Sequence, residues 1–255
     1  MRILMIGNSF SDDTAEYLYQ IAVDAGVKAP EIGNLYIPGC PVSLHALNAR
    51  EDRPAYEYRE NTDGHWVNTP GYKLSTALTG RQWDFISLQQ ASGLSGLGET
   101  FGELDYLIDY VRSLAGSAPE LVWNMTWAYS RGVPHPDFPR YGNDQGRMYG
   151  CILETVKTQI DTRPGISIVC PAGTAIQNVR TSFVGDNITR DGYHLSFGLG
   201  RYTAGLTFFG AVAGRPADNV RFAPEGVDEP QKRIALEAAA AALRNPRTVT
   251  PICGV

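Results

Sequence analysis

Apolar residues along the chain alternate between short continuous runs and stretches with helical spacing. The first run, residues 3–6, is continuous, which is typical of a strand buried on both faces in a parallel sheet. The stretch that follows predicts a helix that begins at Ser11 or Asp12 and ends at Gly26. Further strands are predicted at residues 32–37, 84–88, 121–126 and 166–169, with a hairpin over residues 56–67. Further helices are predicted near residues 73–78, 104–114, 146–160, 174–182, 197–212 and 230–243.

Strands that alternate with helices at this spacing predict a doubly wound fold of the α/β class. We expect a three-layer α/β/α sandwich with a mainly parallel, flavodoxin-like central sheet, and a single domain that spans residues 1–255. In open sheets of this kind, ligands bind beyond the carboxyl ends of the strands. The residues that follow each strand are therefore the first candidates for a functional site.

Composition and charge exclude several classes of protein. The chain has 255 residues, of which 43% are hydrophobic and 19% charged, as in a globular protein. Its formal net charge of −5 and the lack of a basic stripe argue against a nucleic-acid or membrane partner. No apolar run approaches the roughly 18 residues that span a bilayer, and the apolar start stops at Gly7 rather than continuing as a secretion signal. We therefore expect a cytoplasmic protein, with a trimmed secreted chain as the alternative; the oligomeric state stays open.

Other reactive residue types give no sign of a metal or redox site. His45, His65 and His135 lack the spacing of metal ligands, so we interpret them as surface or loop residues and expect no metal and no cofactor. The neighbours Asp12 and Asp13 form a carboxylate pair in sequence, but capping of a helix is the favoured interpretation. Far apart and without a C-x-x-C pair, the cysteines are interpreted as free and mostly buried, with a disulfide left open. These are Cys40, Cys151, Cys170 and Cys253.

Two polar segments, one near each end of the chain, could carry chemistry. In the first, Ser9 lies in the turn after the first strand, where backbone N–H groups at the start of a helix can bind an anion; capping by Ser9 or Ser11 is the structural alternative. In the second, Asp191 comes three residues before His194, and on a helical turn this spacing places both on one face. An imidazole held by a carboxylate in this way can take a proton from a serine hydroxyl.

Together the two segments resemble the SGNH or GDSL hydrolases, and more closely a branch whose first motif reads G-N-S-F rather than G-D-S-L. The likeness covers most of the chain. The similar segments are residues 3–11 (the nucleophile block), 37–40 (the glycine block) and 191–196 (the acid and base block). The resemblance implies Ser9 as nucleophile, His194 as general base and then acid, and Asp191 as the residue that orients His194.

The resemblance also implies an oxyanion hole built from the backbone N–H groups of Ser9 and Gly39 and one side-chain amide. The strand at residues 84–88 departs from the family here, because no G-x-N-D follows it. A glutamine amide is an equivalent uncharged donor, and Gln89 and Gln90 would face opposite sides of a continuing strand. We favour Gln90, nearer the strand tip, with Gln89 as the fallback; hydrogen bonding of this pair to a neighbouring loop is the alternative.

For the substrate site we expect contributions from Asn8, Gln89, Trp127 and Tyr129. Aromatic rings at a pocket mouth can stack on a sugar or line an acyl pocket, although ordinary packing beneath a loop is an equal alternative. The resemblance favours an esterase that removes a small acyl group, acetyl first, from a carbohydrate. A second hypothesis is a non-catalytic module that binds a glycan or another small ligand in the same cleft. No phosphate-binding loop follows the first strand, which argues against a nucleotide binder.

Overall fold

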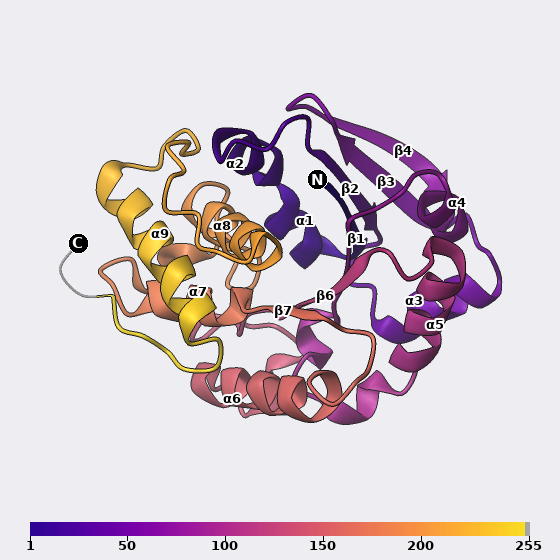
Figure 1. The fold of residues 1–255 in the computed structure, drawn as a ribbon. Coiled ribbons are helices and arrows are strands. Elements are labelled where there is room, and N and C mark those ends of the chain that lie inside the picture. The colour runs from indigo at the N-terminus through magenta and orange to yellow at the C-terminus, as the bar shows by residue number, and fades with distance from the viewer. Residues whose placement is uncertain (253–255) are drawn as a thin grey trace.

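The buried apolar runs of the sequence form the strands of one sheet in the computed structural model, which describes residues 1–252 (Figure 1). The strands are β1 (Arg2–Gly7), β2 (Glu31–Tyr36), β3 (Tyr56–Asn61), β4 (Trp66–Tyr72), β5 (Phe85–Leu88), β6 (Glu120–Asn124) and β7 (Ile168–Cys170). Their order across the sheet is β4-β3-β2-β1-β5-β6-β7. The strands from β2 to β7 in this order are parallel, whereas β3 and β4 form the predicted hairpin and add an antiparallel edge.

The parallel strands follow the order 2-1-3-4-5 of flavodoxin-like sheets. The predicted α/β/α sandwich with a mainly parallel sheet is therefore confirmed, and the hairpin makes the sheet a mixed one. The order reverses at β1, which pairs with β2 on one side and β5 on the other. Connections leave such a reversal toward opposite faces, and a crevice opens at the carboxyl ends of the strands. Ser9 lies at this crevice, because β1 ends at Gly7.

Two groups of helices cover the two faces of the sheet (Figure 1). The first group is α1 (Ser9–Ala15), α2 (Leu18–Asp24), α7 (Ala172–Arg180), α8 (Leu199–Ala213) and α9 (Glu229–Arg244). Within it α8 is buried along most of its length, because α1, α2, α7 and α9 all pack against it. The second group is α3 (Val42–Arg50), α4 (Leu74–Thr79), α5 (Leu104–Ala115) and α6 (Gln145–Thr155). The last of these continues as a π-helical turn, Val156–Ile160.

Two helices differ from the sequence prediction. The predicted first helix is two helices, α1 and α2, and its cap is Asn8 rather than Ser11 or Asp12: the Asn8 side chain accepts a hydrogen bond from the N–H of Phe10. Helix α3 was not predicted, because its buried side includes polar His45 and Asn48 and therefore shows no apolar stripe.

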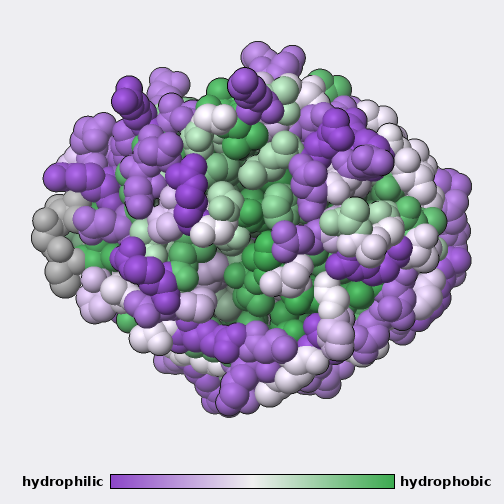
Figure 2. Space-filling model, in the orientation of Figure 1, coloured by the Kyte–Doolittle hydropathy of each residue, from purple (hydrophilic) through white to green (hydrophobic). Residues whose placement is uncertain are grey.

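Hydrophilic residues gather around the rim of the face shown in Figure 2, and hydrophobic residues form a central band near β6 and β7. No helix within residues 1–252 is both long enough and apolar enough to cross a bilayer. The prediction of free thiols is confirmed for Cys40, Cys151 and Cys170, of which the first and last are buried. Burial raises the pKa of Cys40 to about 12, so this thiol stays protonated at neutral pH. Cys253 lies outside the described residues.

Candidate active site

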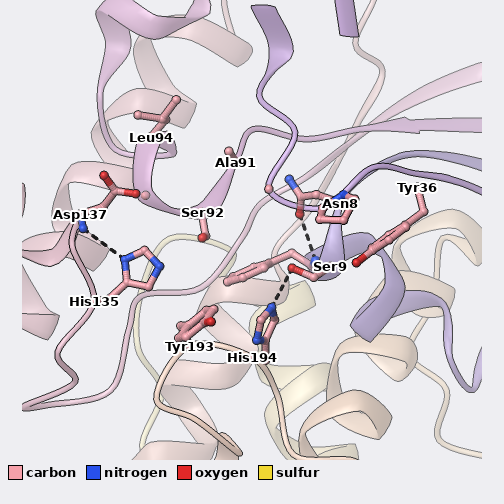
Figure 3. A pocket seen from close by; sticks show the side chains of 14 residues that line it. Asn8, Ser9, Tyr36, Ala91, Ser92, Leu94, His135, Asp137, Tyr193 and His194 are labelled. Atoms are coloured by element: carbon pink, nitrogen blue, oxygen red, sulfur yellow. Dashed lines mark hydrogen bonds between the residues drawn. The ribbon is translucent and has the colours of Figure 1, made fainter. Parts of the chain in front are cut away.

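Ser9, His194 and Asp191 form a continuous chain of hydrogen bonds at the carboxyl end of β1. Figure 3 shows the bond between Ser9 and His194. His194 Nε2 lies 2.8 Å from Ser9 Oγ, and His194 Nδ1 lies 2.6 Å from Asp191 Oδ2. A carboxylate only accepts, so the ring proton belongs on Nδ1 and the Nε2 lone pair faces the serine hydroxyl. Ser9 opens α1 in a turn fixed by Asn8, whose Oδ1 accepts from the Phe10 N–H at 3.0 Å. This arrangement can take a proton from Ser9.

Asp191 also shapes the loop that carries the histidine. Its other oxygen, Oδ1, accepts from the backbone N–H groups of Tyr193 at 3.1 Å and His194 at 2.7 Å. The predicted helical turn is wrong: Gly192 has a φ of +91°, in the region that favours glycine, and the Arg190 N–H donates to the His194 carbonyl across the loop at 3.0 Å. The three-residue spacing therefore brings carboxylate and imidazole together through a hydrogen-bonded loop rather than a helix.

Opposing influences act on the pKa of Asp191. Partial burial is the largest of them and raises the pKa of this carboxyl group. Hydrogen bonds from the His194 ring and from the N–H groups of His194 and Tyr193 together outweigh burial and lower the pKa of Asp191 below its usual value. The carboxylate is therefore ionised at neutral pH, as stabilisation of an imidazolium beside it requires.

A buried ion cluster holds the histidine loop against α1. Asp13 is fully buried, and its Oδ2 accepts from the N–H of Leu195, the residue after the histidine, at 2.8 Å. Its Oδ1 accepts from Arg190 at 3.0 Å and from Arg201 at 2.8 Å. The interpretation of Asp13 as a helix cap is therefore wrong. Sequence reasoning missed this role, and the available signal was a carboxylate one helical turn after Ser9.

Two backbone donors are available beside the serine. Within residues 1–252 the N–H groups of Ser9 and Gly39 donate no hydrogen bond, and both residues line the same pocket. Gly39 has a φ of +61°, and no atom lies within 4 Å of a Cβ added there, so its backbone conformation rather than space calls for glycine. Asn8 joins the two turns, because its Nδ2 donates to the Cys40 carbonyl at 3.0 Å. This pair of N–H groups can stabilise an oxyanion.

The side-chain amides that we expected in the oxyanion hole donate their hydrogen bonds to other groups. Gln90 Nε2 donates to the carbonyl and the hydroxyl of Thr100, at 3.1 and 3.2 Å, and its Oε1 accepts from the Val42 N–H at 3.0 Å. Gln89 Nε2 donates to Asn8 Oδ1 at 2.9 Å. The prediction for Gln90 and its fallback Gln89 is therefore wrong, and the alternative of hydrogen bonding to neighbouring segments is what the structure contains. Asn8 lines the pocket, but these same bonds occupy its side chain.

The two aromatic residues predicted to contact substrate lie behind the pocket wall. Trp127 is fully buried, stacks on Phe10 with ring centroids 4.2 Å apart, and donates from Nε1 to the Tyr193 carbonyl at 2.7 Å. Tyr129 is also fully buried, and its hydroxyl lies 2.9 Å from Ser92 Oγ. Both support residues that line the pocket, which corrects the prediction that they contact substrate themselves.

The cleft around Ser9 has a volume of about 560 Å³, within the usual range for small-molecule sites. Figure 3 shows Tyr36 on one side of the serine, and His135 with Asp137 toward the other end. The Arg59 guanidinium stacks on the Tyr36 ring, 3.7 Å from its centroid. His135 lies in a loop, as predicted, but it also lines the cleft. The interpretation of His45 as a surface or loop residue is wrong, because it is buried in α3 with its Nδ1 3.0 Å from the Tyr56 hydroxyl. Within residues 1–252, no cluster of His, Cys, Asp or Glu side chains is arranged to hold a metal ion.

Comparison with known proteins identifies relatives at two distances. The model of the family described as "Domain of unknown function (DUF4886)" matches residues 2–242. A crystal structure of a DUF4886 family protein from Bacteroides uniformis ATCC 8492 is 40% identical. The match covers 99% of this chain and 98% of that one, with a TM-score of 0.95. No protein with a curated description matches the sequence.

Two structures of low identity share the fold. A catalytic mutant of an acetylxylan esterase from Geobacillus stearothermophilus is 12% identical, with 87% of this chain and 96% of that one covered and a TM-score of 0.55. A GDSL-like protein from Parabacteroides merdae ATCC 43184 is 15% identical, with 83% and 95% covered and a TM-score of 0.51. The seven-stranded sheet with its flanking helices thus matches the α/β fold of SGNH hydrolases.

Proposed function

The chain belongs to the family described as a domain of unknown function (DUF4886), and we propose that it is a serine esterase that removes a small acyl group, acetyl first, from a carbohydrate. One observation carries the proposal: the unbroken hydrogen-bond chain from Ser9 through His194 to Asp191 opens into a cleft of about 560 Å³. A serine becomes a nucleophile when a positioned base accepts its proton, and the third residue holds that base in the required tautomer.

In the acylation step, Ser9 Oγ attacks the ester carbonyl carbon while its proton passes to His194 Nε2. The carbonyl oxygen becomes an oxyanion, which the N–H groups of Ser9 and Gly39 stabilise. Asp191 stabilises the imidazolium through Nδ1. The tetrahedral intermediate then collapses, the bond to the alcohol oxygen breaks, and His194 returns the proton to that oxygen, so that the alcohol leaves and the acyl group stays on Ser9.

Water completes the cycle by the same route in reverse. His194 Nε2 takes a proton from a water molecule, whose oxygen attacks the acyl carbon on Ser9. The oxyanion forms again beside the N–H of Gly39. Collapse of this second intermediate releases the carboxylic acid, and the proton on His194 returns to Ser9 Oγ. The reaction consumes one ester and one water and needs no cofactor.

Two observations support an acetyl group as the acyl half and a carbohydrate as the alcohol half of the substrate. The cleft mixes polar and apolar side chains, including Ser92, His135 and Tyr193, whereas a long acyl chain needs a continuous apolar channel. Such a mixture suits the hydroxyl groups and carbon–hydrogen faces of a sugar. One distant structural relative is named an acetylxylan esterase, which supports acetyl as the first acyl group to test.

The test compares Ser9→Ala with Ser113→Ala, a substitution at an exposed serine of α5. We expect Ser9→Ala to lower kcat/KM for p-nitrophenyl acetate by about 10⁴-fold or more, as removal of a serine nucleophile does elsewhere. A fluorophosphonate probe should label Ser9 in the wild type and not in the His194→Ala variant, while Ser113→Ala behaves as wild type. Unchanged turnover in Ser9→Ala would reject the esterase. Glycan binding without any labelling would instead establish a binding module.

A further inference from the structure

We propose that His135, Asp137 and Tyr193 form a sugar subsite, which binds neighbouring hydroxyl groups of the alcohol half of the ester beside the nucleophile. The inference rests on the esterase function proposed above and names the part of the cleft that selects the alcohol. These residues lie at the end of the cleft away from Tyr36 (Figure 3). None of them has a place in the proton transfers of the reaction.

The position of the general acid decides which half of the ester this end receives. The leaving oxygen must take its proton from His194 Nε2, so the alcohol lies on the histidine side of the scissile bond. The His194 ring packs on Tyr193 with centroids 4.2 Å apart, and Tyr193 meets His135 edge to face at 4.7 Å. The alcohol therefore leaves along a wall made by these rings. Their faces can pack on the carbon–hydrogen face of a sugar.

His135 is held as a hydrogen-bond donor toward the cleft. Its Nδ1 lies 3.2 Å from the backbone N of Asp137, and a backbone N–H only donates, so Nδ1 carries the lone pair. In the neutral ring the proton then belongs to Nε2, which points into the cleft on the side of Ser92 (Figure 3). Burial is the main reason that the pKa of His135 lies below its usual value, and this favours the neutral ring at neutral pH.

Asp137 adds an acceptor without adding a free charge. Its Oδ1 accepts from Arg140 Nε at 3.1 Å, and its side chain is 34% exposed. The carboxylate lies directly over Gly93, since a Cβ added to that glycine would be 2.2 Å from Asp137 Oδ2. Because Arg140 offsets the negative charge, the subsite suits a neutral polyol better than a cation. One donor on His135 and one acceptor on Asp137 match a pair of hydroxyl groups, each of which donates and accepts.

Two variants test the subsite while they leave the triad intact. His135→Phe keeps a ring against Tyr193 but removes the donor, and Asp137→Leu keeps the approximate shape of the side chain but removes its acceptor oxygens. Each should lower kcat/KM about tenfold for an acetylated methyl xyloside, as loss of a hydrogen bond to a sugar hydroxyl predicts, and change that for p-nitrophenyl acetate less than about twofold. The matched controls are His65→Phe and Asp63→Leu, an exposed pair on the hairpin, which should change neither value.

A binding measurement separates this inference from the esterase itself. In a Ser9→Ala background, calorimetric titration with the acetylated methyl xyloside should show binding that Asp137→Leu weakens about tenfold. The subsite is overturned if either variant lowers the turnover of both esters equally, if neither changes turnover of the xyloside, or if the xyloside is neither bound nor hydrolysed while p-nitrophenyl acetate is. Failure of the esterase has a different signature, because Ser9→Ala would then leave hydrolysis of p-nitrophenyl acetate unchanged.

Discussion

Gly39 shows how one backbone conformation can limit the reaction. Its φ of +61° costs an L-residue about 1–2 kcal/mol, although a Cβ there would touch nothing within 4 Å. We expect Gly39→Ala to lower kcat about 10²-fold with little change in KM, because the N–H beside the oxyanion is displaced. Steady-state kinetics on p-nitrophenyl acetate measure this effect.

Gly71→Ala is a matched control for backbone strain. Gly71 has a φ of +69°, equally open surroundings and a place in β4, on the antiparallel edge of the sheet. This variant should lose similar stability in thermal unfolding and keep its kcat. Equal loss of kcat in Gly39→Ala and Gly71→Ala would trace the effect to stability and remove Gly39 from the oxyanion hole.

A second prediction for a single residue concerns Asp191. Asp191→Asn should lower kcat about 10³- to 10⁴-fold, because an amide at this position no longer fixes the His194 tautomer or stabilises the imidazolium. In the folded protein the pKa of Asp191 lies below its ordinary value of about 3.9. As the pH falls, the carboxylate therefore stays ionised until the pH reaches that lowered pKa. Activity measured from pH 8 down to about pH 5 should therefore show no loss from protonation of Asp191. Asp63→Asn, on the exposed hairpin, serves as the control.

Sequence rules found the residues whose contacts are local or follow from the sheet, and missed those that depend on loop conformation. Ser9 follows β1, and Asp191 reaches His194 across three residues, but only the resemblance to the SGNH hydrolases predicted that the serine and this pair form one site. The rule for Gln90 assumed a continuing strand, but β5 ends at Leu88 and the glutamine turns toward Thr100. His135 lies on a long loop after β6 and lines the cleft. The spacing of apolar residues in the sequence does not predict the path of such a loop.

At the scale of elements, α1 connects the nucleophile to the loop of the base. The helix begins at Ser9 and carries Asp13, which bonds to the backbone N–H of Leu195 and to Arg190 and Arg201. We therefore assign Asp13 as a positioning residue that fixes the position of the histidine loop relative to Ser9. Removing one member of a buried ion cluster leaves the others without compensation, which costs about 3–5 kcal/mol of unfolding free energy.

Kinetics of Asp13→Asn, measured well below its unfolding temperature, distinguish an effect on the position of the histidine loop from an effect on the stability of the fold. We expect kcat to fall about tenfold with KM nearly unchanged, and the rate of fluorophosphonate labelling of Ser9 to fall in parallel, because the distance between serine and base is no longer fixed. Asp12→Asn, at the neighbouring half-buried carboxylate, should leave both rates within about twofold. If folded Asp13→Asn keeps wild-type kcat and labelling rate, Asp13 acts on stability alone.

The elements themselves were predicted where one physical signal dominates. A continuous apolar run sufficed for β1, and Asp63-Gly64 marked the hairpin of β3 and β4. Helix α3 was missed because it buries His45 and Asn48 along with its apolar residues, so its pattern is not amphipathic. Apolar periodicity indicates burial of apolar groups, and it gives no signal for a helix that also buries polar side chains.

At the scale of the whole molecule, the site depends on the complete sheet. Ser9 and His194 are 185 residues apart, and they meet because β1 lies at the reversal of strand order while the histidine loop folds back onto α1. A contact of such long range forms only when most of the chain is folded. Activity should therefore be lost together with the global fold, so the conditions that unfold the protein also set the limits of its function.

Among those conditions, pH acts through His45, a buried histidine of α3. Its Nδ1 lies 3.0 Å from the Tyr56 hydroxyl, its Nε2 has no hydrogen-bond partner among the described residues, and burial lowers the pKa of His45 to about 3. In the unfolded chain the ordinary value is about 6.5. Between these two values the unfolded state binds one more proton than the folded state, so the unfolding free energy decreases by about 1.4 kcal/mol per pH unit as pH falls.

His45→Phe removes the group that takes up this proton and keeps a ring stacked on Tyr56. In urea titrations, the wild type should lose about 2 kcal/mol more unfolding free energy between pH 7 and pH 5 than this variant. His65→Phe, at an exposed histidine, should follow the wild type. If wild type and His45→Phe lose the same free energy, then His45 is either protonated in the folded protein or neutral in the unfolded chain at pH 5. Its burial would then have no part in the acid sensitivity of the fold.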